Sequence, residues 1–271
     1  MSKVGADMKV TLAQKKHRIG EKEKNLKVIE NTAEEEKTDL LIFPEMFLTG
    51  YCLRDRLWYE SEKIPGPSSR EISRLAVEND MNIICGMPEK VKNDGRLRNT
   101  ALLATSEGEL HRYRKTYLPN FGPFQDKRYF HEDDDLPVFE TSLGKIGLLI
   151  CYDIFFPELT KTMARKGVDV IAVISASPST TRKYFEKVIP TRAIETTSYL
   201  FYSNLVAREE NMYFWGGATA ISPKGEIIGK GKYFEEDLVE SEIDLDILSD
   251  ARRNRPVLSD TRKELMDYDL E

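Results

Sequence analysis

The chain has 271 residues, of which 40% are hydrophobic and 32% are charged, enough for one large core or two small ones. Its formal net charge of −6 disfavours the phosphate backbone of a nucleic acid as a partner. No apolar window is long enough to cross a bilayer, and no linker divides the chain. We therefore expect a soluble protein with a single domain over residues 1–271 and no membrane partner.

The cysteines and histidines bear on compartment and metal content. Three cysteines are an odd number and too few for a disulfide framework, which indicates a reducing cytoplasm. His17, His111 and His131 lie far apart, without the paired spacing that zinc ligands show. We expect a cytoplasmic protein with no metal site.

Strands and helices alternate from the start of the chain. Leu26, Ile29 and Ala33 recur at helical spacing between two apolar runs, which is typical of a βαβ unit. The first predicted elements are a strand over 8–14, a helix over 22–37, a strand over 39–43, a helix that follows 67–69 and ends at 79–80, and a strand over 81–86. Strands over 98–105 and 110–113 then form a hairpin, and an irregular stretch covers 119–137.

The second half of the chain repeats this order. It predicts a strand over 145–151, a helix over 157–166, a strand over 168–175, a helix over 183–197, a strand over 199–206 and a hairpin of 214–221 with 226–228. These strands are too apolar for sheets with one solvated face, so helices should cover them. Two similar halves favour an α/β fold in which two sheets pack face to face between helices, a four-layer αββα sandwich.

Cys151 directly follows the apolar run 147–150 and precedes the predicted helix at Pro157. A thiol at the carboxyl end of a central strand lies where α/β enzymes place reactive groups, and nearby backbone amide dipoles would favour a thiolate. The alternative is that Cys151 is a small buried hydrophobe in the core. The residue alone leaves both interpretations open.

Two charged residues follow other predicted strands. Glu45 ends the run 41–45, where a buried carboxylate suits a general base, although it could also cap the strand or pair with a cation. Lys115 follows an edge-like strand, where an ammonium could hold a thiolate and stabilise a developing oxyanion. With Arg112 and Arg114 beside it, Lys115 could instead belong to a solvated face.

Taken in order, the short motifs around these residues resemble the nitrilase superfamily of carbon-nitrogen hydrolases. The resemblance spans nearly the whole chain and is carried by Phe43-Pro44-Glu45 with Thr49-Gly50-Tyr51, Tyr113-Arg114-Lys115, Cys151-Tyr152-Asp153 with Phe156-Pro157-Glu158, Arg192-Ala193-Ile194-Glu195, Ser203-Asn204, and Phe214-Trp215-Gly216-Gly217 with Pro223-Lys224-Gly225. It implies an αββα sandwich, extended across a homodimer or larger homo-oligomer to αββααββα. The helices over 157–166 and 183–197 would form the dimer face.

The resemblance also implies a mechanism that needs no metal or organic cofactor. Glu45 would take the proton from Cys151, whose sulfur attacks an amide or related carbon. Lys115 and the backbone amide of Tyr152 would hold the oxyanion. Ammonia or an amine would leave, and water activated by Glu45 would hydrolyse the thioester.

One position departs from the family pattern. Many relatives carry a second glutamate in the loop after the lysine, and here Asp126 stands in its place, one methylene shorter. Asp126 could orient Lys115, Glu132 could reach in instead, or Asp126 could form a simple ion pair with Lys127 or Arg128.

The substrate is less clearly indicated. Phe155 stands where many amidase-type relatives have Arg, so it is either an apolar pocket wall or part of the core, and Ser177 with Pro178 could also line the pocket. The small-molecule substrate would be an amide, ω-amide or N-carbamoyl amine, and ammonia would be released. Residues 117–122 and 127–130 look closest to the glutaminase-like domains of NAD synthetases, so an ammonia supplier to a separate synthetase, a true nitrilase and a catalytically idle scaffold are the alternatives.

Overall fold

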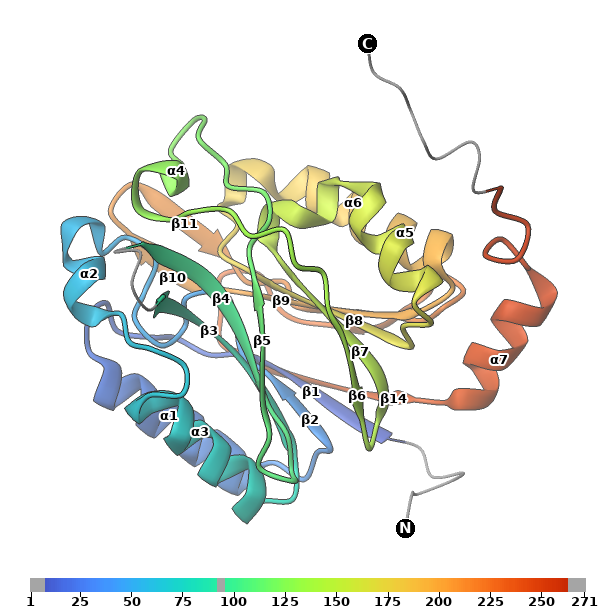
Figure 1. Cartoon of the computed structure of the whole chain (residues 1–271), viewed down its shortest axis with the longest axis horizontal. Coiled ribbons are helices and arrows are strands. Elements are labelled where there is room, and N and C mark those ends of the chain that lie inside the picture. The colour runs from blue at the N-terminus through green and yellow to red at the C-terminus, as the bar shows by residue number, and fades with distance from the viewer. Residues whose placement is uncertain (1–7, 92–95, 263–271) are drawn as a thin grey trace.

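The computed structural model describes residues 8–91 and 96–262, so the outermost ends of the domain predicted over 1–271 lie outside the described residues. Two six-stranded mixed sheets pack face to face (Figure 1). The first, in spatial order, contains β14 (Asp237–Ile243), β1 (Met8–Gln14), β2 (Leu40–Ile42), β3 (Asn82–Lys90), β4 (Leu97–Ala104) and β5 (Leu110–Arg114). The second contains β13 (Ile227–Lys230), β12 (Thr219–Ile221), β9 (Tyr199–Asn204), β8 (Val170–Ser175), β7 (Gly144–Ile150) and β6 (Val138–Thr141).

Helices cover the outer faces of both sheets, which confirms the predicted αββα sandwich. Helices α1 (Lys22–Glu35) and α3 (Pro67–Glu78) lie on the first sheet, and α5 (Pro157–Arg165) and α6 (Arg182–Thr196) lie on the second (Figure 1). The smaller elements are α2 (Leu57–Glu60), α4 (Asp126–Tyr129), α7 (Leu245–Asn254), a ribbon of β10 (Val206–Glu209) with β11 (Met212–Trp215), and the 3₁₀ turns η1 (Arg54–Arg56), η2 (Cys151–Phe155) and η3 (Ser179–Thr181). Across the described ranges, no helix is long and apolar enough to span a membrane.

The apolar run that ends at Glu45 is buried on both faces because its side chains alternate between two cores. Leu40 and Ile42 point into the core between the sheets, whereas Leu41 and Phe43 pack with α1 and α3. The continuous apolar run is therefore a strand with both faces covered, as the sequence predicted.

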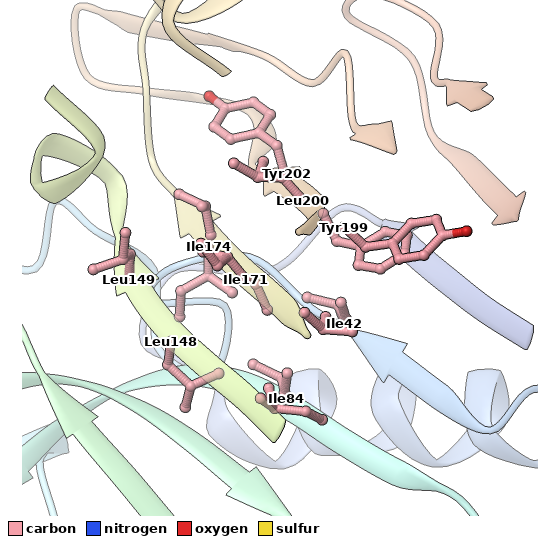
Figure 2. Close-up of a cluster of buried hydrophobic side chains, with 14 of the residues drawn as sticks. Ile42, Ile84, Leu148, Leu149, Ile171, Ile174, Tyr199, Leu200 and Tyr202 are labelled. Atoms are coloured by element: carbon pink, nitrogen blue, oxygen red, sulfur yellow. The ribbon is translucent and has the colours of Figure 1, made fainter. Parts of the chain in front are cut away.

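The core between the sheets joins the two halves of the chain. Figure 2 shows Ile42 of the first sheet on the side that faces the second sheet, where Leu148, Ile171 and Leu200 are labelled. Each of these side chains is at most 1% exposed. Burying each of them contributes roughly 1.5–3 kcal/mol relative to exposure, so the sandwich holds its two sheets in a defined register.

 Ile84 of β3 lies on the same inner face as Ile42 and belongs to this core.

The structure corrects several predicted elements in the second half of the chain. The strand predicted over 214–221 is broken, because Gly216 and Gly217 adopt positive φ and turn the chain out of the sheet. Residues before the break pair in the β10–β11 ribbon, and only 219–221 form the predicted hairpin with β13. Strands β6 and β14 and helix α7 were not predicted from the sequence.

Both helices of the predicted dimer face, α5 and α6, lie on one outer face of the sandwich (Figure 1). That placement is compatible with a face-to-face pairing of two second sheets. The dimer stays a prediction.

Candidate active site

Glu45, Lys115 and Cys151 come together because the strands before them end at the same edge of the sandwich. Strands β2 and β7 run parallel to their neighbours β3 and β8, so the residues after them gather at one end. The strand β5 delivers Lys115 to the same place, where its ammonium contacts the Glu45 carboxylate. The sequence predicted this gathering from motif order alone.

A tight approach of two backbones fixes the position of Glu45. A Cβ atom on Gly86 of β3 would lie 2.6 Å from the Cα of Glu45 and 2.4 Å from the backbone nitrogen of Met46. Met46 itself adopts a left-handed φ of 54°, so the chain turns sharply directly after the carboxylate. Only glycine leaves room for this turn, which holds Glu45 against β3.

The carboxylate of Glu45 is fully buried and accepts three hydrogen bonds. Its Oε1 accepts from the Nδ2 of Asn99 at 2.7 Å and from the Nζ of Lys115 at 2.9 Å. Its Oε2 accepts from the backbone nitrogen of Ala176 at 2.6 Å. A carboxylate with these partners is held in one orientation and belongs to the site, so it is more than a cap at a strand end.

Lys115 is 1% exposed, so it does not belong to a solvated face. Its Nζ donates to Glu45 and to the Oδ2 of Asp126, each at 2.9 Å. Burial alone would lower the pKa of Lys115, but the charges of Asp126 and Glu45 outweigh it and raise that pKa well above its usual range. The ammonium therefore stays charged, and its third N–H is left to donate to a ligand.

Asp126 is the acidic residue that the fold places against Lys115. It is the first residue of α4 and 3% exposed, and it also accepts a short hydrogen bond from the hydroxyl of Tyr51. Glu132 pairs instead with Lys127 on the surface, at 3.0 Å. Of the alternatives for this loop, the contacts support Asp126 as the partner of Lys115.

Cys151 opens the 3₁₀ turn η2 with a left-handed φ of 50°. This conformation is uncommon for a residue with a side chain and indicates a backbone held in place by its surroundings. Asp153 supplies that support, because its carboxylate accepts from the backbone nitrogens of Tyr117 and Ile150 and from the hydroxyl of Tyr113. Burial raises the pKa of Asp153 to about 6.

Burial of Cys151 opposes the thiolate that amide dipoles were expected to favour. Cys151 is 4% exposed, and burial, reinforced by the charge of Glu45, raises the pKa of its thiol above the usual range. Lys115 and the neighbouring hydrogen bonds oppose this shift without reversing it. The resting thiol is therefore neutral, and its proton must be removed as the sulfur reacts.

A cavity of about 190 Å³ reaches Cys151 from the surface. The side chains around it share an apolar or uncharged character: Pro119, Phe121, Phe124, Tyr152, Phe155, Thr181, Tyr184 and Phe185. Phe155, for which the sequence left two interpretations, lines this cavity. The backbone amides of Cys151 and Tyr152 open the η2 turn, where amides have no partner within the turn.

Ser177 and Pro178 are not among the residues that line this cavity. Ser177 is fully buried, and its Oγ contacts the Oγ1 of Thr181 and accepts from the indole of Trp215. Pro178 forms a β-bridge with Phe214. The residue of this segment that lines the cavity is Thr181, in η3.

Sequence reasoning missed two groups that hold Glu45. Asn99 lies on β4 and the amide of Ala176 follows β8, so each is distant in sequence from the carboxylate. Asn99 had no distinctive sequence signal, because it stands between the polar residues Arg98 and Thr100 at the start of its strand. Nothing in a sequence marks one backbone amide among many.

The α/β sandwich holds a carboxylate, an ammonium and a thiol together in a buried site. These are the groups that a hydrolase uses, so the fold and the site define an enzyme of that class. Within the described residues, no group of three or more potential ligands could hold a metal ion. The chain belongs to the carbon-nitrogen hydrolase family, whose profile matches residues 9–253.

Several relatives share most of the chain. A nitrilase of Pyrococcus abyssi is 32% identical over 268 residues, covering 95% of this chain and 98% of the relative. The omega-amidase NIT2 of Bos taurus is 32% identical over 248 residues, covering 88% of each chain. A mutant amidase from Nesterenkonia sp. AN1, solved after Michael addition of acrylamide at its active-site cysteine, has a TM-score of 0.80 and 25% identity and covers 96% of this chain and 98% of that one. The chain is thus a carbon-nitrogen hydrolase.

Proposed function

We propose that this hydrolase is an amidase that works through a thioester on Cys151, with Glu45 as general base and Lys115 as oxyanion donor. The contact that carries the proposal is the 2.9 Å bond between Lys115 and Glu45, buried beside a thiol that opens onto a cavity. The covalent adduct at the cysteine of the Nesterenkonia amidase supports a cysteine nucleophile here.

In the first half of the reaction, Glu45 takes the proton from the sulfur of Cys151 while the sulfur bonds to the amide carbon. The raised pKa of the thiol makes this transfer necessary, because a free thiolate is scarce at neutral pH. The negative oxygen accepts from Lys115 and from the amide of Tyr152. The C–N bond then breaks, and the proton on Glu45 leaves with ammonia.

In the second half, water enters the position that ammonia has left. Glu45 takes a proton from this water as its oxygen bonds to the thioester carbon, and Lys115 again holds the oxyanion. The C–S bond breaks, the carboxylic acid leaves, and the proton returns from Glu45 to the sulfur. Atoms and charges balance over the cycle.

Ammonia release over a panel of primary amides, carbamoyl amines and nitriles tests this proposal. At least one primary amide should release ammonia, and peptide mass analysis after an acid quench under turnover should find the acyl group on the peptide that contains Cys151. Release of ammonia from nitriles alone, or no acyl adduct at Cys151 with a good substrate, would contradict it.

Replacement of Glu45 by glutamine is expected to lower kcat/KM by about 10²–10⁴-fold, the usual contribution of a general base. Glutamine keeps the shape of the side chain, but it cannot accept the proton of the thiol. The measurement is kcat/KM for wild type and variant with the same primary amide, at one pH. Glu140→Gln, at a surface position on β6, is the matched control and should keep wild-type activity; an equal loss there would contradict the assignment.

Replacement of Asp126 by alanine is expected to slow turnover about tenfold or more, a change of ~1.4 kcal/mol in the barrier. Asp126 acts through Lys115, which would keep Glu45 as its remaining partner, so the protein should still fold. Removing this carboxylate should also lower the pKa of Lys115 and shift the alkaline limb of the pH profile downward. Full activity with an unchanged profile would remove Asp126 from the site.

A further inference from the structure

We infer that the acyl part of the substrate is uncharged and apolar, and that it carries a ring or a branched chain. This inference rests on the proposed amidase function and extends it to a substrate class. The cavity beside Cys151 is the observation that carries it, since the residues that line it bear no charge.

The size of the cavity suits one ring. Its volume is about 190 Å³, and an apolar protein cavity of about 150 Å³ is known to hold benzene. Cys151 is a buried residue of the lining, so a ring one or two bonds from an amide carbon at its sulfur would fill the space beside it. A straight two-carbon acyl group would leave much of the cavity without contacts.

Aromatic side chains form the walls and hold one another in place. Phe155 packs edge-on against Phe185 with ring centroids 5.0 Å apart at 84°, and Tyr152 packs against Phe121 at 5.3 Å and 63°. Phe121 and Tyr184 are about half exposed and mark the mouth. Offset and edge-on contacts are the arrangements that aromatic rings prefer, so a ligand ring can join them.

A charged acyl group has no partner in this cavity. Lys115 is already neutralised by Glu45 and Asp126. Lys183 lies over the ring of Tyr184, but it is exposed and does not line the cavity. A carboxylate on the substrate would therefore lose its water without gaining a cation, which is costly in an apolar site.

The test compares kcat/KM for phenylacetamide and the branched 4-methylpentanamide with kcat/KM for glutaramate and glutamine. The apolar amides should be favoured by at least about 100-fold, because the charged groups lose their hydration without compensation. Equal or better turnover of glutaramate or glutamine would overturn the inference while leaving the amidase function in place. Turnover of no amide at all would contradict the proposed function instead.

Two substitutions place a cation in the cavity. Phe155→Arg should reverse part of the preference in favour of glutaramate, and Phe155→Leu, which stays apolar, should not. Phe155 packs against Phe185, so Phe155→Arg could disrupt the fold. Tyr184→Arg is therefore the second variant, because Tyr184 is half-exposed at the mouth of the cavity and its replacement should leave the protein folded. Preference unchanged in a folded arginine variant would overturn the inference.

Ligand binding gives a readout that does not depend on turnover. Phenylacetone and levulinate are ketones that resemble the two amide classes and cannot be hydrolysed. Phenylacetone alone should raise the Tm, because a ligand that binds only the folded state stabilises it. A rise with levulinate, or no rise with phenylacetone, would overturn the inference.

Discussion

Replacement of Cys151 by alanine is expected to reduce the proposed amidase activity by at least about 10⁴-fold, as for loss of a nucleophile that acts as a unit with its base. The thioester cannot form without the sulfur, and Glu45 and Lys115 then face the substrate with no nucleophile between them. The protein should stay folded, because alanine fills most of the same small buried position. Activity is measured as ammonia release and folding as thermal unfolding.

Cys52 offers the matched control for this variant. It is a free, half-buried thiol in a loop, and no step of the proposed reaction uses it. Cys52→Ala should keep wild-type kcat/KM. More than about 1% residual activity in Cys151→Ala would mean that another group attacks the substrate, because loss of a true nucleophile removes far more.

Replacement of Lys115 by methionine is expected to remove activity and to destabilise the fold by about 3–5 kcal/mol, the cost of breaking a buried ion pair. Methionine has a similar length, but it leaves the carboxylates of Glu45 and Asp126 buried without their cation. Chemical denaturation measures the free energy of unfolding, and ammonia release measures the activity.

At neutral pH, Lys115→Met should show the full loss of unfolding free energy that is expected for this variant. The folded-state pKa of Lys115 is raised, so its stabilising contribution is fully present below the unfolded value of about 10.4 and is lost only as the pH rises through the higher folded value. The wild type and Lys115→Met should therefore differ in stability from pH 6 to pH 9, by the same sign throughout.

A double variant separates the two roles of Lys115. Lys115→Met with Asp126→Asn removes one of the uncompensated charges, so part of the stability should return while activity stays absent. Recovery of both would show that Lys115 supports only the fold. Full activity in the single variant would contradict its place at the oxyanion.

Much of the site could be predicted because its residues each follow a recognisable strand. Glu45 and Cys151 directly follow apolar runs, Lys115 follows the edge strand β5, and parallel strands end at a common edge. The protonation of the thiol could not be predicted this way. Burial and the charge of Glu45 set it, and both depend on packing between distant segments.

The less regular parts of the fold show the same limit. β14 has few apolar residues and pairs with β1 across more than two hundred positions of sequence, so its strand character comes from its partner. The break at Gly216 and Gly217 likewise depends on the close approach of Gln14, whose side chain a Cβ on Gly216 would meet at 2.5 Å. Local patterns carry neither contact.

The sequence by itself determined the αββα sandwich, the family and the three residues of the proposed triad. Hydrophobic periodicity and motif order are local properties that survive without coordinates. Only the tertiary structure decided that Asp126 contacts Lys115, that Asn99 and the amide of Ala176 hold Glu45, and that the cavity at Cys151 is apolar. Asn99 and Ala176 lie 54 and 131 positions from Glu45, and the 11 positions between Lys115 and Asp126 form a loop without a periodic pattern, so tertiary packing brings these groups together.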